Sequence, residues 1–166
     1  ILGAPPVRPP FTNSGLHSRA VHSALIWSRL EQAGITDIQG VWAHEAGSAT
    51  HFMVISLKQR YAGHAAQVAF MASQIMKSFG RFVVTVDEDI DPSNLNDVVW
   101  AMSTRCDPAD DIDIIRRCWS FRLDPIQSAK KRSTGSRAII DACKPFDLKK
   151  TFPASITVSE ELRKQV

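Results

Sequence analysis

The sequence predicts an α/β fold with a mixed, mostly parallel sheet flanked by helices. The first observation is the continuous apolar run Phe82–Val86, which is rich in β-branched residues and typical of a strand buried on both faces. The second is helical periodicity on both sides of this run, over residues 62–79 and again after Asp91. The third is a pair of strand-like segments, 38–43 and 51–57, separated by a short turn. We therefore expect one α/β domain with Phe82–Val86 as its central strand.

The amino-terminal half is predicted to contain a linker, a helix and a hairpin. Residues 1–15 are rich in Pro and Gly and are expected to be extended. Apolar residues then recur at helical spacing over His17–Ala33, and Gly34 is the expected C-cap. The strands Ile38–Ala43 and His51–Leu57 are close enough in sequence to pair as antiparallel neighbours.

The second predicted helix, Ala62–Phe79, is unusual for its many small residues. Gly80 is expected to end it, directly before the central strand. Small side chains allow close packing on a sheet or on a partner helix. They are Ala62, Gly63, Ala65, Ala66, Ala69, Ala72 and Ser73.

A dense acidic loop follows the central strand and leads into a third helix. Asp91 is expected to cap this helix, with Pro92 at its first position. The loop would then lie at the carboxyl end of a central strand, where open α/β sheets usually place function. The carboxylates are Asp87, Glu88, Asp89 and Asp91, and the helix residues expected to face the sheet are Leu95, Val98, Val99 and Met102.

The remaining segments give weaker signals. Ile112–Ile115 is predicted to be a last short strand, and the polar, basic segment Asp124–Arg137 an exposed loop. Ala138–Cys143 fits a short helix or a strand. In the tail, Ser159 is a candidate helix N-cap.

The chain has 166 residues, enough to bury a core. We predict a linker over 1–15, an α/β domain over 16–150 and a tail over 151–166 that is truncated or docks at an interface. The chain begins without Met and in a linker-like segment, so we expect it to be a piece of a longer protein.

Composition argues against several classes of protein. A net charge of +3 with both signs interspersed gives no electrostatic footprint for nucleic acid. No apolar run approaches the roughly 20 residues of a membrane span, and Ile1–Pro10 lacks the apolar region of a signal peptide. Cys106, Cys118 and Cys143 form no CxxC pair, which favours reduced thiols in a cytoplasmic protein over disulfides or a zinc site.

The acidic loop is the first candidate for chemistry. Its alternating Asp87, Asp89 and Asp91 are similar to a calcium loop, but Pro92 and Val98 stand where Gly and a bidentate Glu are needed. Asp87 and Asp89 could instead serve a phosphotransferase as a magnesium or nucleophile pair. The structural alternative is that Asp91 caps the helix and its neighbours interact favourably with the helix N-terminus.

Two further groups are weaker candidates for a site. His44, Glu45 and His51 lack the HExxH spacing and lie in a predicted turn, so solvated turn residues are favoured over a metal site. Cys106 follows a helix end, where the helix field does not lower the pKa of a thiol, so a nucleophilic role is not expected.

Lys77 and Arg81 flank the start of the central strand and could reach an anionic group, although exposed Lys and Arg are usually just solvated. The sequence contains no Ser/His/Asp set, P-loop or GxGxxG motif. The residues alone therefore complete no active site.

Three sequence blocks resemble the carboxy-terminal domain of the UbiD family, in the same order. They are YAGHAAQV, RFVVTVDEDIDPSNLNDVVWAMSTRCDPADDIDII and SRAIIDACKP, within Ile35–Pro145. The middle block is the most specific, and SRAIIDACKP is most similar to members that act on phenolic or heteroaromatic acids. The resemblance implies a decarboxylase, in some members run as a carboxylase, that uses prenylated FMN.

The resemblance also implies that catalysis needs residues outside this sequence. In the family an Arg, a Glu-x-x-x-x-Glu pair and the ligands of Mn²⁺ and K⁺ lie in the amino-terminal part, and none of those blocks occurs here. We therefore expect the chain to be inactive alone and to serve pocket closure and oligomerisation. The expected partners are its own amino-terminal flavin-binding domain, further copies of the same protein and an aromatic carboxylic acid. A non-catalytic assembly module is the alternative.

Two functional positions of the family fall within this chain. Family members line the substrate pocket with a bulky and an aliphatic residue two apart, and Phe121 and Leu123 occupy those places. Ordinary core or interface residues are the alternative for both. In some members a lysine before the central strand reaches the flavin phosphate; Lys77 is nearest, with Arg81 as the alternative.

Overall fold

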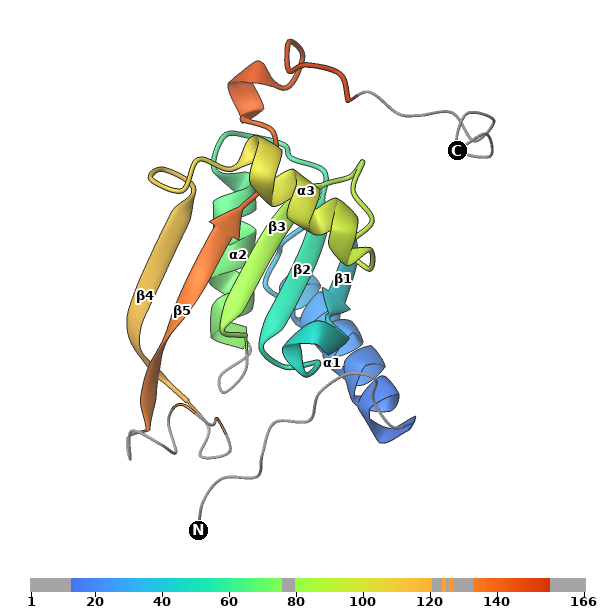
Figure 1. The fold of residues 1–166 in the computed structure, drawn as a ribbon, viewed down its shortest axis with the longest axis vertical. Helices are drawn as coiled ribbons and strands as arrows, with labels where there is room; N and C mark the ends of the chain where they lie inside the picture. The colour runs from blue at the N-terminus through green and yellow to red at the C-terminus, as the bar shows by residue number, and fades with distance from the viewer. Residues whose placement is uncertain (1–12, 76–79, 121–123, 125, 127–132, 156–166) are drawn as a thin grey trace, which may run out of the picture.

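The computed structural model describes residues 13–75, 80–120, 124, 126 and 133–155. These residues form a five-stranded sheet in the order β1-β2-β3-β5-β4 (Figure 1). The central strand β3 pairs in parallel with β2 and β5, whereas β1–β2 and β4–β5 are antiparallel. The predicted mixed sheet, its central strand and the hairpin are confirmed. The strands are β1 Ile38–Ala43, β2 Phe52–Leu57, β3 Phe82–Asp87, β4 Ile112–Trp119 and β5 Thr134–Asp141.

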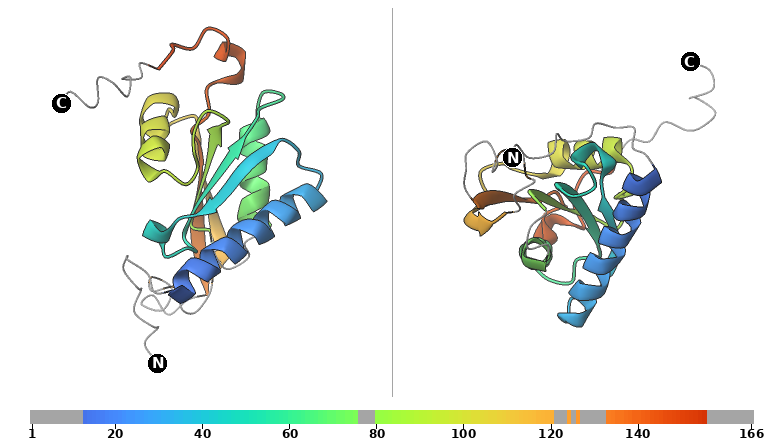
Figure 2. Two further views of the ribbon diagram at one scale, coloured as in Figure 1. Left: turned by 90° about the vertical axis from the view of Figure 1, so that its right-hand side faces the viewer. Right: turned by 90° about the horizontal axis from the view of Figure 1, so that it is seen from below.

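Helices cover both faces of the sheet. Helices α1 (Asn13–Gln32) and α2 (His64–Ile75) pack on one face and α3 (Leu95–Arg105) on the other (Figure 2). Helix α1 starts earlier than predicted, so residues 13–15 are helical rather than extended. Across the described part of the chain, no helix has the length and hydropathy needed to cross a membrane.

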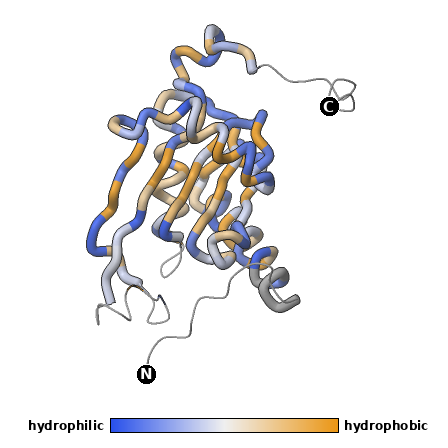
Figure 3. Tube along the Cα trace, viewed as in Figure 1, coloured by the Kyte–Doolittle hydropathy of each residue, from blue (hydrophilic) through white to orange (hydrophobic). Residues whose placement is uncertain are grey.

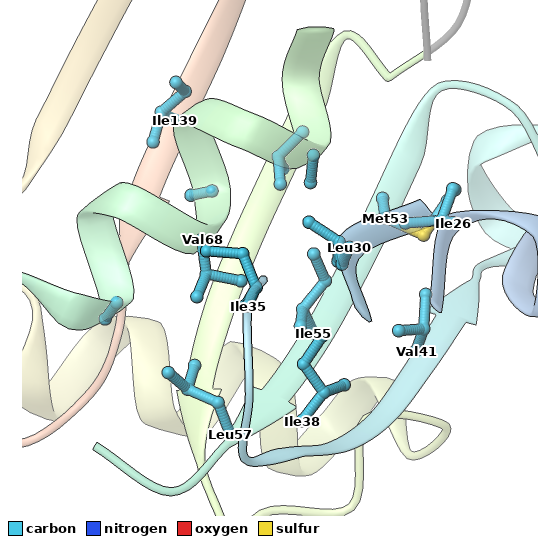
Figure 4. Close-up of a cluster of buried hydrophobic side chains, with 14 of the residues drawn as sticks. Ile26, Leu30, Ile35, Ile38, Val41, Met53, Ile55, Leu57, Val68 and Ile139 are labelled. Atoms are coloured by element: carbon cyan, nitrogen blue, oxygen red, sulfur yellow. The ribbon is translucent and has the colours of Figure 1, made fainter. Parts of the chain in front are cut away.

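Each face of the sheet buries its own hydrophobic cluster. The larger cluster lies under α1 and α2 and contains Leu30 and Val68 (Figure 4). Val83 belongs to the same cluster. Val84 joins the smaller cluster with Val98 under α3. Successive strand residues point to opposite faces, and here both faces are covered, so β3 needs apolar residues throughout. Hydrophobic residues accordingly run along the strands (Figure 3).

Helix α2 begins at His64 rather than Ala62, so Ala62 and Gly63 precede it and are exposed, whereas most of its other small residues pack inward as predicted. Ala65, Ala69, Ala72 and Ser73 are buried, and α2 contacts β3, β5 and α1. Phe70, by contrast, lies on the outer side of α2 and is exposed. The predicted end of this helix at Phe79 lies outside the described residues.

Helix α3 starts later than predicted, and its N-cap is not Asp91. Asn94 is the N-cap, because its side chain accepts a hydrogen bond from the Asn96 N–H at 3.1 Å. Asp91 instead accepts from the backbone N–H and the hydroxyl of Ser93, at 2.8 and 2.7 Å. Its carboxylate closes a tight turn, and Pro92 therefore lies before the helix.

The sheet-facing side of α3 also differs from the predicted one. Val98 is buried and Met102 is partly buried, as predicted, but Val99 is 50% exposed. The buried side continues through Ala101 to Arg105. The apolar pattern did not predict this buried side, because one of its three buried residues, Arg105, is charged.

The end of the chain contains more strand than predicted. Strand β4 extends to Trp119 and is not the last strand, and β5 begins at Thr134, inside the predicted exposed loop. Strand β4 is an edge strand with a bulge at Arg117, whose φ is 62°. The candidate cap Ser159 lies outside the described residues.

Candidate functional site

The candidate residues gather at the two ends of β3. Asp87 is the last residue of β3 and Asp89 follows it, whereas Arg81 directly precedes the strand; the two ends of β3 can be followed in Figure 1. Because β4 runs opposite to β3, the end of β4 and the start of β5 also lie beside the amino end of β3.

At the carboxyl end, the side chain of Asp87 is 1% exposed and well supplied with donors. Its Oδ2 accepts from Arg105 Nη1 at 3.2 Å and from the Lys144 backbone N–H at 2.7 Å. Its Oδ1 accepts from Gln59 Nε2 at 2.9 Å and lies 3.3 Å from Lys149 Nζ. A buried carboxylate needs such partners, and those of Asp87 join β3 to three other segments.

Asp89 shares Arg105 with Asp87 and has Lys144 as its second cation. Arg105 binds both of its carboxylate oxygens at 2.9 Å, and Lys144 Nζ lies 2.7 Å from Oδ2. Partial burial acts to raise the pKa of Asp89, but the hydrogen bonds and charges of Arg105 and Lys144 outweigh it and lower the pKa to about 2. The Arg105 guanidinium also lies over the Trp100 ring, 5.1 Å from its centroid.

This arrangement, which we call the carboxyl-end cluster, is a cross-link rather than a metal or nucleophile site. Its carboxylates are paired with cations, Asp87 with Arg105 and Lys149, and Asp89 with Arg105 and Lys144, whereas a magnesium ion needs carboxylate oxygens that are free to coordinate it. Among the residues that the structure describes, no group of three or more His, Cys, Asp or Glu side chains is arranged to bind a metal ion. Its members are Asp87, Glu88, Asp89, Arg105, Lys144 and Lys149.

Arg105 lies in the middle of the three sequence blocks that resemble the family, but no role was predicted for it. A signal was available, since Arg105 follows Val98 by seven residues and Ala101 by four and so shares their buried side of the helix. Lys144 and Gln59 had no comparable signal, because each lies far from Asp87 in sequence.

A cleft of about 480 Å³ lies beside the carboxyl-end cluster. Arg105 and Lys144 contribute to its wall, but both are engaged by Asp89. The remaining lining comes from the outer side of α3 and from the segment after β5. These residues are Trp100, Thr104, Phe152, Pro153, Ala154 and Ser155.

The histidine–glutamate pair after β1 is structural. His44 is buried, not solvated as predicted, and its Nε2 donates to the Pro92 carbonyl at 2.9 Å. Burial lowers the pKa of His44. Glu45 pairs instead with Arg19 on α1, at 3.1 Å. These contacts attach the turn to α1 and to the loop before α3.

Cys106 follows the last residue of α3. Burial and then the nearby charges of Asp111, Asp141 and Asp107 raise the pKa of its thiol. This direction agrees with the expectation that Cys106 is not an activated nucleophile.

At the amino end of β3, Arg81 and Asp124 form an ion pair. Arg81 Nη2 lies 2.5 Å from Asp124 Oδ1, and the two side chains are 24% and 6% exposed. Asp124 also accepts from Ser120 Oγ at 3.1 Å and from the Ile126 N–H at 3.0 Å. Burial acts to raise the pKa of Asp124, but the bond and charge of Arg81 lead the effects that lower it.

His51 lies beside this pair, directly before β2. Its carbonyl accepts from the Phe82 N–H at 2.9 Å, which places it next to the start of β3. Burial lowers the pKa of its imidazole, the Arg81 charge lowers it further, and the Asp124 charge acts in the opposite direction. We call His51, Arg81 and Asp124 the amino-end cluster.

Lys77, Phe121 and Leu123, the site residues implied by the resemblance, lie outside the described residues. The described residues nearest to them in sequence are Ile75 and Gly80 for Lys77, Ser120 for Phe121 and Asp124 for Leu123. Arg81, which follows Gly80, forms the ion pair with Asp124. Arg81, the alternative to Lys77, is therefore engaged by a carboxylate. Sequence reasoning missed Asp124, which it placed in an exposed loop.

Comparison with known proteins identifies the family of this chain. A family model described as 3-octaprenyl-4-hydroxybenzoate carboxy-lyase C-terminal domain matches residues 16–142. A phenolic acid decarboxylase of Sedimentibacter hydroxybenzoicus is 34% identical over 113 residues, which cover 67% of this chain and 22% of that protein.

Two solved structures share the fold. The apo 3,4-dihydroxybenzoic acid decarboxylase of Enterobacter cloacae superposes with a TM-score of 0.78 at 25% identity, over 87% of this chain and 31% of that one. The UbiD-class enzyme HmfF of Pelotomaculum thermopropionicum, in complex with FMN, gives 0.75 at 26% identity, over 86% and 31%. The chain thus spans less than a third of each of these relatives.

Proposed function

Because the chain belongs to the UbiD carboxy-lyase family through its carboxy-terminal domain, we propose that it is part of an enzyme that reversibly decarboxylates an aromatic acid. The acid is phenolic or heteroaromatic, and the cofactor is prenylated FMN. The match over residues 16–142 carries the proposal, supported by relatives that are phenolic and dihydroxybenzoic acid decarboxylases.

The chemistry is divided between two parts of the whole protein. The catalytic Arg, the Glu pair and the ligands of Mn²⁺ and K⁺ belong to the amino-terminal part. This chain closes one wall of the substrate pocket with Phe121 and Leu123 and joins protomers. The share of each relative that it covers, 22 to 31%, supports this division.

The amino-end cluster fits a flavin phosphate nearby. A guanidinium has five N–H donors, so Arg81 keeps donors beyond the one given to Asp124, and Lys77 lies four residues before it. Lys77 is the proposed phosphate ligand, with Arg81 as the alternative. Prenylated FMN, when bound, supplies an electron sink for the ring that loses CO2. The residues of this chain orient the phosphate and keep water from the pocket.

The test compares the chain alone with the same chain joined to its amino-terminal part. Both receive prenylated FMN, Mn²⁺ and K⁺, and CO2 release is followed from 3,4-dihydroxybenzoate and from a furan carboxylate. We expect CO2 release only from the complete protein and not from the isolated chain. Release from the isolated chain above background would contradict the division of labour, and none from the complete protein with either class of acid would contradict the decarboxylase.

An assembly role is supported by apolar side chains on the outer sides of the helices. Leu25 on α1, Phe70 on α2, and Val99 and Trp100 on α3 are between 39% and 50% exposed. We expect the complete protein to be a homo-oligomer by light scattering. A purely non-catalytic module would self-associate in the same way, but Phe121→Ala in the complete protein would then leave KM unchanged.

A further inference from the structure

We propose that the free edge of β4 pairs with β4 of a second copy of this chain, antiparallel and about a twofold axis at Ile114. Strand β4 is the last strand of the sheet, and no other described segment pairs with its outer side (Figure 1). Such an edge presents unpaired N–H and C=O groups that proteins usually cover or block. The inference rests on the proposed function only for the assembly role of this chain, to which it gives a surface and a partner.

The backbone of β4 determines which groups face outward. The Asp141 N–H donates to the Asp111 carbonyl at 2.9 Å, in line with the register of β4 and β5. Asp111 therefore bonds toward β5, and in an antiparallel ladder such residues alternate with residues whose backbone groups point away. The N–H and C=O groups of Ile112, Ile114 and Arg116 accordingly face the free edge.

These outward residues are complementary to themselves under a twofold axis. When Ile114 lies opposite Ile114 of the second copy, Ile112 lies opposite Arg116 of the second copy, so each outward N–H meets an outward carbonyl. A shift by one residue would set outward groups against residues that bond toward β5. The Ile114 side chain is 47% exposed, and in this register it covers its own counterpart, with the two Cβ atoms about 5 Å apart.

The charges along β4 favour an antiparallel copy. Acidic residues precede and begin the strand, at Asp110, Asp111 and Asp113, and basic residues follow at Arg116 and Arg117. Antiparallel pairing sets the acidic start of one copy against the basic end of the other, whereas parallel pairing would oppose like charges.

These charges are available to a partner. The side chains of Asp113, Arg116 and Arg117 are exposed, and none of them forms a hydrogen bond or an ion pair with another residue that the structure describes. Charge complementarity therefore favours a second copy of this strand over a strand of unrelated sequence.

The bulge at Arg117 limits the pairing to residues 112–116. The register of β4 and β5 shifts between Arg116 and Cys118, and Arg117 has a φ of 62°. A bulge of this kind bends the strand and ends regular pairing. The contact is therefore short and closed: it uses the β4 edge of both copies and leaves neither β4 edge open to a third.

The first experiment is a cross-link in the complete protein carrying Ile114→Cys. In the proposed register the two Cα atoms at this position lie about 5.5 Å apart, within the range of a disulfide. We expect mild oxidation to give about 10-fold more covalent dimer than in the control Val21→Cys. Val21 is also an exposed apolar residue, but it lies on α1, which packs on β1 at the other edge of the sheet.

The second experiment reverses charges, with Asp113→Arg and Arg117→Asp as separate variants of the complete protein. Both positions are exposed, and Asp tolerates the positive φ at position 117. Each variant opposes like charges twice across the twofold axis, so the dissociation constant of the dimer should rise by about 10-fold in sedimentation velocity.

An equimolar mixture of the two single variants should restore the contact as mixed dimers, because opposite charges then face each other. Mass tags on one variant identify these dimers. The combined variant Asp113→Arg/Arg117→Asp should likewise pair with itself, and it serves if either single variant folds poorly.

The outcomes separate the edge contact from the proposed decarboxylase. A wild-type protein that releases no CO2 but whose Ile114→Cys variant is cross-linked defeats the decarboxylase and supports the edge contact. An active wild type that is monomeric, or whose Ile114→Cys variant gives no more dimer than Val21→Cys, overturns the edge contact. A mixture of charge variants that stays dissociated also overturns it, since β4 would then not face its own copy.

Discussion

Arg105 is the residue on which the carboxyl end of β3 depends. Its side chain is 1% exposed and binds both Asp87 and Asp89 while lying over the Trp100 ring. Removing one partner of a buried ion pair leaves the other charge in a poorly solvated place, and that cost exceeds the net value of the pair itself.

Arg105→Met should therefore destabilise the chain strongly. It keeps the aliphatic stem but leaves the buried Asp87 without its guanidinium, and we expect a loss of about 3–5 kcal/mol in the free energy of unfolding. Urea denaturation measures it. Lys149→Met, which removes a more exposed partner of Asp87, should cost less than about 1 kcal/mol. Similar losses in both variants would show that burial of Arg105 does not matter.

Stability should fall as the pH falls from 7 to 5. Burial lowers the pKa of His44 below its usual 6.5, so in this range the unfolded chain binds more protons than the folded one. His51 and His64 act in the same direction. His44→Gln, which retains a donor for the Pro92 carbonyl, should flatten the dependence in urea titrations at each pH. An unchanged slope would exclude His44 as its source.

A second loss of stability is expected at a lower pH than the one caused by the histidines. The pKa of Asp89 is lowered to about 2 from 3.8, so the stability that it contributes is present above pH 4 and is lost as the pH falls toward 2. The two windows do not overlap, and one unfolding series over pH can separate the histidines from the carboxylate.

At the scale of elements, the packing of α2 on the sheet depends on the small side chains of its buried side. Ala65, Ala69 and Ala72 are at most 1% exposed, which lets the helix backbone approach β3 and β5. The close approach leaves no room for a larger side chain, because protein interiors are packed as densely as organic crystals.

Ala69→Leu should accordingly cost about 1–3 kcal/mol or more through overpacking. Ala20→Leu on α1 is the matched control, because it makes the same change at an exposed helical position and should stay within about 0.5 kcal/mol of wild type. Thermal unfolding of both variants measures the difference. Equal melting temperatures would mean that α2 moves away from the sheet at little cost.

Elements with a strong periodic signal were predictable, and those decided by distant contacts were not. Strand β3 is evident from its apolar run, because both its faces are buried. The start of α3 is not, since Asp91 and Asn94 are both good N-caps. Pro92 decides between them: it packs on Gly40, where an added Cβ would lie 2.9 Å from its Cγ, and it accepts from His44.

Dependence on distant contacts also limited how much of the candidate site could be predicted from the sequence. Asp87 and Arg105 are 18 residues apart and Arg81 and Asp124 are 43 apart, so no local pattern joins either pair. Strand β4 was underestimated because it is an edge strand with no fully buried residue and so lacks a continuous apolar run. The roles of Lys77, Phe121 and Leu123 stay predictions.

At the scale of the whole molecule, stability should be graded from the centre of the sheet to its edge. Strand β3 lies between two parallel neighbours under helices on both faces, whereas β4 is an edge strand with a bulge at Arg117. Regions with few buried contacts open locally with a lower free energy than the core.

Hydrogen exchange should reveal this gradient. We expect the amides of β3 to exchange on the order of 100-fold more slowly than those of the outer half of β4, residues 116–119. Peptide-resolved mass spectrometry on the complete protein measures both. Uniform protection would indicate that another surface covers the β4 edge, as in an assembled oligomer.

Under the proposed function, the separation of the two clusters along β3 has a consequence for laboratory evolution of substrate range. Random changes near Asp87 disturb a network of paired charges, so we expect many variants there to be destabilised. Diversity is better directed to the connections next to Arg81 and Asp124, with those two residues kept constant. The carboxyl-end cluster at the opposite end of β3 is best left unchanged, so that the stability of the domain is kept.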